Sequence, residues 1–190
     1  MLPMKIKLAV VLIVSLISII SNSSYSQTNK SFSVQGYYGS VVPFSSKTDF
    51  LTTDFTWGIE ANYKISGSTF ATLTFSVNDF ESNPPLPIEF YNDYTRAYNY
   101  SAGFKQYFTV SDNIFPYGKI QAGLYNVREF DTEIYPHEIS YNSFGINSGG
   151  GVLYKYDQSV GAFAEAVFHN VFTDDNFNFM TIQGGIKFDF

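Results

Sequence analysis

Residues 55–65 read FTWGIEANYKI, and this stretch decides the fold class. Every odd position carries an apolar or aromatic side chain, whereas every even position carries a polar residue or glycine. Alternation with a period of two indicates a β-strand with one apolar and one polar face. Eleven residues is also the length that a tilted strand needs to cross a lipid bilayer. The stretch therefore predicts a membrane-crossing β-strand.

The same alternation recurs along the rest of the chain, whereas helical periodicity is absent after residue 26. We expect eight strands, at residues 32–40, 55–65, 69–78, 94–107, 115–125, 144–156, 159–168 and 179–190. Three connections are short (66–68, 108–114 and 157–158), and four are long (41–54, 79–93, 126–143 and 169–178). Short periplasmic turns that alternate with longer outer loops are typical of membrane barrels. The pattern predicts an all-β fold, an eight-stranded antiparallel transmembrane up-and-down β-barrel with both termini in the periplasm.

The N-terminus predicts a cleaved secretory signal peptide. Lys5 and Lys7 precede a run of 13 apolar and serine residues, 8–20, and a small-x-small site follows at residues 24–26. Because a transmembrane helix needs about 20 apolar residues, a signal peptide is the better interpretation of this run. We therefore expect residues 1–26 to be removed and residues 27–190 to form an outer-membrane β-barrel. Cysteine is absent, which excludes a lipoprotein anchor, disulfides and thiolate metal sites.

The composition fits a protein whose surface is not exposed to water alone. Aromatic residues make up 19% of the chain and charged residues only 15%, below the roughly 25% that is typical of soluble domains. Without the two lysines of residues 1–26, nine Lys and Arg residues stand against 17 Asp and Glu residues. This acidic balance excludes the basic footprint of a nucleic-acid-binding protein.

Charged residues provide an independent test of the alternation. Eight of them fall well inside the predicted strands, and all share the polar face: Glu60, Lys64, Lys105, Lys119, Lys155, Glu165, Lys187 and Asp189. A charge that faces lipid at mid-depth costs roughly 2–4 kcal/mol, so these side chains should point into the lumen. Arg96 is the exception, because it shares the face of Tyr98 near the outer end of its strand. The interior of an eight-stranded barrel is filled by side chains, so we expect a salt-bridged plug, with a narrow polar conduit as the alternative.

Alternation alone leaves open which face meets lipid. A soluble ligand-binding barrel would turn the apolar face inward. The unequal loops, the aromatic residues near strand ends and the aromatic C-terminal residue favour a membrane barrel.

The C-terminal strand, QGGIKFDF at residues 183–190, resembles the assembly signal of outer-membrane barrels. Its pattern is polar-x-Gly-x-x-hydrophobic-x-aromatic. The resemblance implies that the barrel-assembly machinery recognises Gln183, Gly185, Phe188 and Phe190.

A broader pattern is similar to the small outer-membrane β-barrel family that includes the membrane domain of outer membrane protein A. It is carried by Phe115-Pro116-Tyr117-Gly118, Gly123-Leu124-Tyr125 and Ala164-Glu165-Ala166. The pattern extends over residues 27–190 without a peptidoglycan-binding domain, so we do not expect cell-wall anchoring.

Catalysis is a weaker hypothesis. Some small barrels modify lipid A with a histidine, a serine and an acid, and this chain has His137 near Ser140 and His169 near Asp174. His169 has inward parity, whereas a lipid deacylase needs its base toward lipid, and the His-x-Ser-Asn run of that family is absent. We therefore expect no enzyme and no cofactor.

The predicted outer loops are acidic and aromatic. Asp131-Thr132-Glu133 and Asp174-Asp175 could bind Ca²⁺ or Mg²⁺ weakly, although solvated acidic loops are the simpler interpretation. Aromatic residues among the acids could form a protein-binding surface: Phe90, Tyr91, Phe130, Tyr135 and Phe172. We expect a monomeric, non-enzymatic outer-membrane protein that is structural or binds a ligand or protein through its loops. The alternatives are a narrow small-solute channel and a lipid A-modifying outer-membrane enzyme.

Overall fold

The computed structural model describes residues 31–44, 51–82, 94–131, 137–173 and 177–190. The predicted signal peptide, residues 1–26, lies outside these ranges, and so does the loop segment 83–93 with its Phe90 and Tyr91. Within the described residues, no helix is long and apolar enough to cross a membrane.

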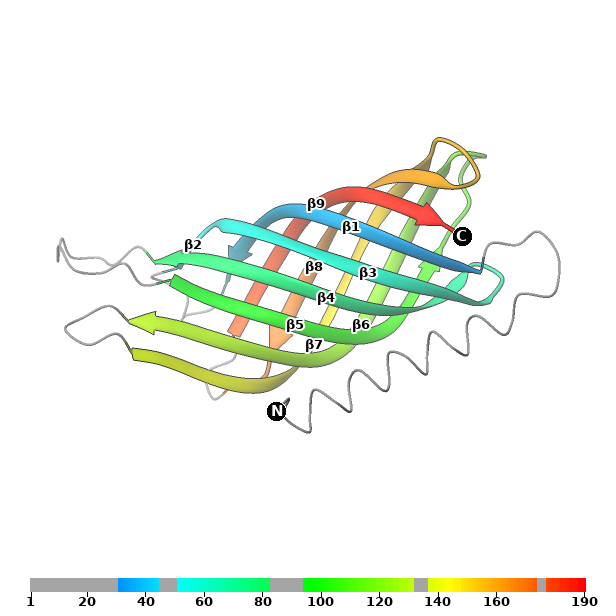
Figure 1. The fold of residues 1–190 in the computed structure, drawn as a ribbon. Coiled ribbons are helices and arrows are strands. Elements are labelled where there is room, and N and C mark those ends of the chain that lie inside the picture. Colours follow the sequence, from blue (N-terminus) through cyan, green and yellow to red (C-terminus); the bar gives the residue numbers. More distant parts are fainter. Residues whose placement is uncertain (1–30, 45–50, 83–93, 132–136, 174–176) are drawn as a thin grey trace, which may run out of the picture. The chain divides into compact units, whose positions relative to one another are not determined.

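Eight long antiparallel strands form one closed barrel, as the sequence predicts (Figure 1). They are β1 (Phe32–Pro43), β3 (Asp54–Ser66), β4 (Thr69–Ser82), β5 (Tyr94–Tyr107), β6 (Ile114–Asp131), β7 (His137–Lys155), β8 (Val160–Val171) and β9 (Phe177–Asp189). Each strand pairs with the next along the chain, and β1 pairs with β9 to close the ring. The two-residue strand β2 (Leu51–Thr52) adds to the end of β4. Closure leaves no sheet edge along the body of the barrel.

One end of the barrel, here called the turn end, carries the short connections 67–68, 108–113 and 156–159. Gly67 has a φ of 51°, so it occupies the left-handed region that favours glycine in a two-residue hairpin. The chain ends at this same end, next to the start of β1, because Phe190 N–H donates to Phe32 O. The opposite end, here called the loop end, carries the longer connections.

The strands run further toward the loop end than the sequence suggests. The predicted loop 126–143 was wrong over most of its length, because β6 continues to Asp131 and β7 begins at His137. The predicted loops 79–93 and 169–178 are also shorter, since β4 runs to Ser82 and β9 begins at Phe177. In these extensions the two faces exchange character: Phe80 and Val127 point inward and are fully buried, whereas the outward Asn126 and Arg128 are polar. A polar outer face is not what a lipid-crossing strand shows, so these stretches were predicted as loops although the ladder continues.

The outer wall of the barrel is apolar. Large hydrophobic side chains with more than a third of their surface exposed occur on all eight long strands, and examples are Ile120 (57%), Leu124 (59%) and Ile182 (53%). A soluble monomer rarely exposes so large a continuous apolar surface. The wall suits lipid, and a soluble barrel with the apolar face inside does not fit this structure.

Inside the barrel, glycines make room for large side chains. A Cβ at Gly58 would lie 2.5 Å from the hydroxyl oxygen of Tyr37 and 2.5 Å from Phe75 O. Tyr37 can therefore lie across β3 only because residue 58 lacks a side chain. Such close packing of rings on backbone narrows the lumen further.

Candidate functional site

A cluster of four charged residues crosses the lumen between β3, β5, β6 and β8. Lys105 pairs with Glu60, and Lys119 lies 3.3 Å from Glu60 Oε2 and 2.8 Å from Glu165 Oε1. All four side chains are almost completely buried. Their charges sum to zero, so their mutual attraction offsets part of the cost of removing four ions from water.

Neutral side chains complete the solvation of this cluster. Tyr117 O–H donates to Glu165 at 2.9 Å, and Gln183 Nε2 donates to the same carboxylate at 2.6 Å. Thr74 O–H donates to Glu60 at 3.1 Å, and Lys105 Nζ donates to Gln35 Oε1 at 3.3 Å. Gln35, Thr74 and Tyr117 could not be identified as partners from the sequence, because the register across the barrel decides which residues meet.

A second group of charges lies nearer the turn end. Lys155 Nζ is 3.0 Å from Asp189 Oδ2, and Lys187 pairs with the same carboxylate. Lys64 shares the inward parity of these residues but is only partly buried, and it makes no ion pair with another residue in the described ranges. The structure thus divides the eight predicted charges into one cluster of four, one cluster of three and the separate Lys64.

Arg96 lies on the outer wall, as its parity predicts. Its guanidinium pairs with Asp79 of the neighbouring strand β4, with Nη2 3.0 Å from Oδ2. The pair is near the loop end, where an outward charge costs little in a membrane.

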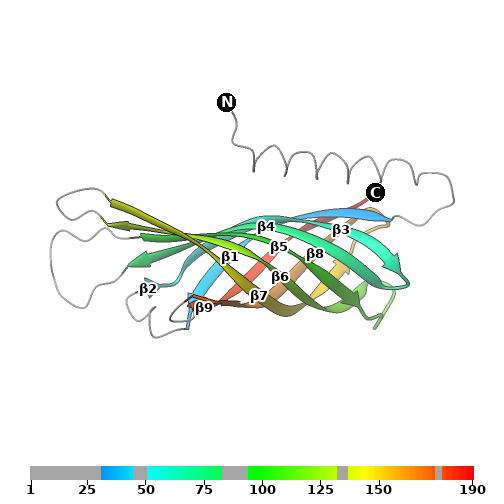
Figure 2. The same cartoon turned by 90° about the horizontal axis from the view of Figure 1, so that it is seen from below.

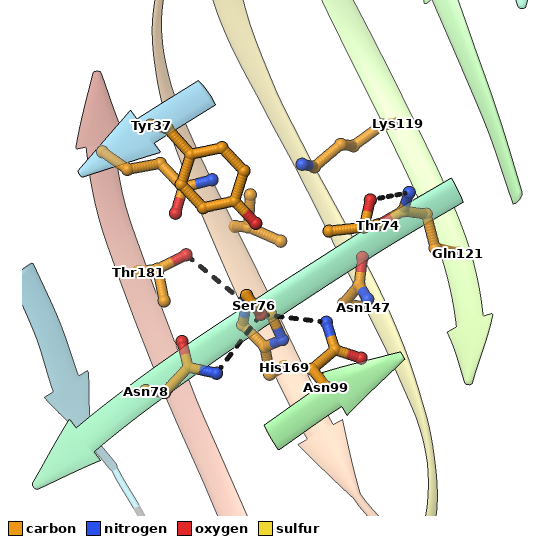
Figure 3. A pocket seen from close by; sticks show the side chains of 12 residues that line it. Tyr37, Thr74, Ser76, Asn78, Asn99, Lys119, Gln121, Asn147, His169 and Thr181 are labelled. Atoms are coloured by element: carbon orange, nitrogen blue, oxygen red, sulfur yellow. Dashed lines mark hydrogen bonds between the residues drawn. The ribbon is translucent and has the colours of Figure 1, made fainter. Parts of the chain in front are cut away.

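A small polar chamber lies beside the four-residue cluster, toward the loop end. Figure 3 shows polar side chains converging on it, and its lining comes from β1 and from every strand between β4 and β9. Asn147 Nδ2 and Gln121 Nε2 donate to neighbouring hydroxyls, at 3.3 Å to Ser101 and 2.7 Å to Thr74. The chamber offers about 10 Å³ to the centres of water molecules, room for roughly one water. It is too small for an organic ligand.

Apolar side chains close the lumen above the chamber. This loop-end cluster consists of Val41, Phe80, Ala97, Tyr125, Val127, Val171, Phe177 and Phe179. Phe80 and Phe179 are fully buried and pack edge to face with ring centroids 5.2 Å apart. Nearer the turn end a second group of rings fills the space around Tyr107 and Tyr117. Among the described residues, two apolar clusters and the ion pairs between them occupy much of the lumen.

The histidines do not form a catalytic group in the described residues. His169 is buried inside the barrel, with its ring stacked on Phe179 at 4.4 Å and its Nδ1 2.9 Å from the hydroxyl of Tyr125. It faces the lumen rather than lipid. The side chain of His137 lies outside the described residues, although its backbone begins β7 opposite Asp131.

The predicted metal-binding loops fall mostly outside the described residues. Residues 132–136, with Glu133 and Tyr135, and residues 174–176, with Asp174 and Asp175, are not described, and Asp131 and Phe130 are described only in their backbone. Among the described residues, no group of three His, Asp or Glu side chains could hold a metal ion. Phe172 is described, and its ring stacks on Phe144 with centroids 6.2 Å apart.

The four residues of the predicted assembly signal lie on β9 and its end. Phe188 and Phe190 point outward, with 47% and 67% of their surfaces exposed. Gln183 is buried in the lumen, and a Cβ at Gly185 would lie 2.0 Å from Gly36 O. Glycine at this position lets β9 approach β1 at the seam that closes the barrel.

Comparison with known proteins identifies the fold but no protein with a similar sequence. No family model matches the chain, and no curated protein does. Neisserial surface protein A aligns with a TM-score of 0.65 at 18% identity, over 84% of this chain and 97% of that one. The N-terminal barrel domain of Pseudomonas aeruginosa OprF aligns at 0.57 and 14% identity, over 86% and 100%. Outer membrane protein OprG of the same species aligns at 0.57 and 10% identity, over 87% and 98%. The structure has the fold of these small membrane barrels.

Proposed function

We propose that this protein, with its fold of a small outer-membrane β-barrel, is a non-enzymatic integral protein of the bacterial outer membrane. It acts through its outer end, as a structural component or as a binding protein. The observation that carries the proposal is the filled lumen. Among the described residues, buried rings and ion pairs occupy the lumen, so the surface at the loop end is the part that can interact.

The strongest alternative is a narrow small-solute channel. A solute would have to pass the buried rings of Phe80 and Phe179 and then separate Lys105 and Lys119 from Glu60 and Glu165. Removing one partner of a buried ion pair costs roughly 3–5 kcal/mol, so spontaneous opening is rare.

Electrical recording distinguishes a closed barrel from a small-solute channel. Residues 27–190, purified and inserted into planar bilayers, should give no discrete conductance steps, whereas a known porin added to the same membrane should. Reproducible steps from the wild-type chain would reject a closed barrel. A Phe80→Gly, Phe179→Gly variant, which empties part of the loop-end cluster, should become leakier if that cluster is the barrier.

The second alternative is a lipid A-modifying enzyme. His169 faces the lumen and contacts Phe179 and Tyr125, which places its ring away from lipid substrates. Mass spectra of lipid A from cells with and without the protein should therefore be identical. A mass change that His169→Ala or His137→Ala abolishes would establish the enzyme instead.

Export and assembly are part of the proposal. The signal peptide should be cleaved after Ser26, so N-terminal sequencing of the mature protein should begin at Gln27. We infer that the barrel-assembly machinery recognises the outward Phe188 and Phe190 together with Gln183 and Gly185. Deleting Phe190 should lower the amount in the outer-membrane fraction while the purified variant still folds in detergent. Outer-membrane lipid is the expected surrounding, the protein is expected to be a monomer, and no cofactor is required.

A further inference from the structure

Strands β6 and β7 continue past the point where their neighbour β8 stops. β7 pairs with β6 from His137 onward, whereas its pairing with β8 begins only at Gly145, opposite Val171. Figure 2 shows β6 and β7 extending beyond β8 and β9 at the loop end. Within the described ranges, residues 138–143 of β7 therefore have a strand on one side only.

The register decides which backbone groups face this open edge. Phe144 O accepts a hydrogen bond from Phe172 N–H at 2.9 Å, so residue 144 directs its backbone groups toward the side of β8. Successive residues of an antiparallel strand alternate in this direction. Ser140 and Asn142 therefore present their N–H and C=O groups to the open edge, and Tyr141 presents its groups to β6.

The edge is held in place by its own side chains. Tyr141 is partly buried against the loop-end cluster, and its hydroxyl donates to Glu129 at 3.1 Å. Across the hairpin, Asn126 Nδ2 donates to Asn142 Oδ1 at 3.0 Å. A pre-ordered edge binds an extended chain without first having to order itself.

The sequence of the edge lacks the usual protection. Residues 138–143, EISYNS, contain no proline and no basic residue, and their single charge is Glu138 at the outer end. Exposed edges are normally blunted by lysine, proline, a bulge or a covering segment. A regular edge whose one charge is negative is suited to accept another strand, above all a cationic one.

A second copy in the same membrane is not the natural occupant. Two barrels inserted in the same direction would bring their β7 edges together in parallel, and parallel pairing is slightly less stable per residue than antiparallel pairing. Antiparallel pairing of two copies would require opposite orientations in the membrane.

The composition of the segments that connect the strands at the loop end indicates what kind of chain would fit. Twelve of the 17 acidic residues belong to segments 44–54, 79–96, 126–143 and 172–176, against three basic residues in the same segments. Such a charge imbalance attracts a cationic partner and speeds its association.

We propose that residues 138–143 of β7 bind an extended, positively charged polypeptide segment of an extracellular partner by β-strand addition. This inference rests on the proposed function, since it identifies the binding surface and the class of partner. About six residues of the partner can pair with the edge, and apolar side chains of that segment that point inward would lie beside Tyr141.

The test uses residues 27–190 in lipid nanodiscs and a fluorescent heptapeptide, Lys-Val-Lys-Val-Thr-Val-Lys, as the probe. Ser140→Pro removes one edge N–H, and an edge strand tolerates proline where that group has no ladder partner. Ser140→Ala is the matched control, because it removes the hydroxyl and keeps the N–H. Fluorescence anisotropy should show binding to the wild type and to Ser140→Ala, and at least tenfold weaker binding to Ser140→Pro. Empty nanodiscs and a peptide with glutamate for lysine provide the baselines.

Hydrogen exchange of the wild type keeps the test valid if Ser140→Pro fails to fold. The probe should slow exchange at the amides of residues 140 and 142 more than at other loop-end amides. Equal affinity for the proline and alanine variants, protection elsewhere, or no binding would overturn the inference. If one of these results is found and the barrel also shows no conductance in planar bilayers, the proposed function stands. Conductance steps would reject that function directly.

Discussion

Replacing Glu60 by glutamine should destabilise the barrel more than any comparable change on its surface. Glu60 is fully buried and pairs with both Lys105 and Lys119. Lys119 keeps Glu165 at 2.8 Å after the change. Lys105 loses its carboxylate and keeps only neutral partners, among them the Gln35 oxygen at 3.3 Å and the ring of Tyr117, whose centroid is 4.7 Å from Nζ.

The expected cost follows from this loss of charge balance. A buried cation without its carboxylate corresponds to a destabilisation of about 3–5 kcal/mol. The free energy of unfolding can be measured by urea titration of residues 27–190 in lipid vesicles, with tryptophan fluorescence from Trp57 and the mobility of unboiled samples as signals. In the Glu60→Gln variant, the midpoint of unfolding should move to a lower urea concentration in both signals. The dependence of the unfolding free energy on urea concentration should not change.

Two further variants make the result specific. Glu81→Gln makes the same chemical change at an exposed site near the loop end and should alter the unfolding free energy by less than about 0.5 kcal/mol. The double variant Glu60→Gln, Lys105→Met removes the unpaired cation and should recover much of the lost stability. A Glu60→Gln barrel within about 1 kcal/mol of the wild type would show that the ion cluster does not hold the lumen together.

Three other predictions concern packing, lipid contact and the turn. Gly58→Ala should cost roughly 1–3 kcal/mol because its Cβ would meet the Tyr37 hydroxyl, whereas Gly36→Ala, with nothing within 4 Å, should change little; urea titration of both variants checks this. Ile120→Lys should cost about 2–4 kcal/mol in vesicles if residue 120 faces the middle of the bilayer, and an unchanged midpoint would place it elsewhere. Gly67→Ala, at a φ of 51°, should lower stability by about 1 kcal/mol, measured as a lower unfolding midpoint without a change in the folded spectrum.

The sequence predicted the fold because membrane strands obey a strict rule. Lipid on one side and a packed lumen on the other force side chains to alternate, so stretch 55–65 alone indicates a strand and its two faces. The inward parity of Glu60, Lys105, Lys119 and Glu165 was readable for the same reason. The charges could be assigned to a face, but not to partners.

Where the outer face turns polar beyond the lipid, the prediction was wrong. In β6 beyond Asn126 and β7 before Phe144 the described outward side chains are polar, whereas Val127 and Tyr141 pack with the loop-end cluster, and the whole stretch was predicted as a loop. Their pairing is visible only in the ladder Asn126↔Asn142 to Asp131↔His137. The open edge of β7, on which the further inference depends, was therefore invisible in the sequence.

The sequence by itself determined the class of fold, the number of long strands, and which side chains point outward and which inward. The tertiary structure decided that Lys119 bridges Glu60 and Glu165, that Phe80 meets Phe179, and that β8 stops short of β7. Alternation is a local property of each strand and is written in consecutive residues. Register around a closed barrel joins residues far apart in sequence, such as Lys105 and Glu60, which are 45 positions apart, and no local pattern encodes it.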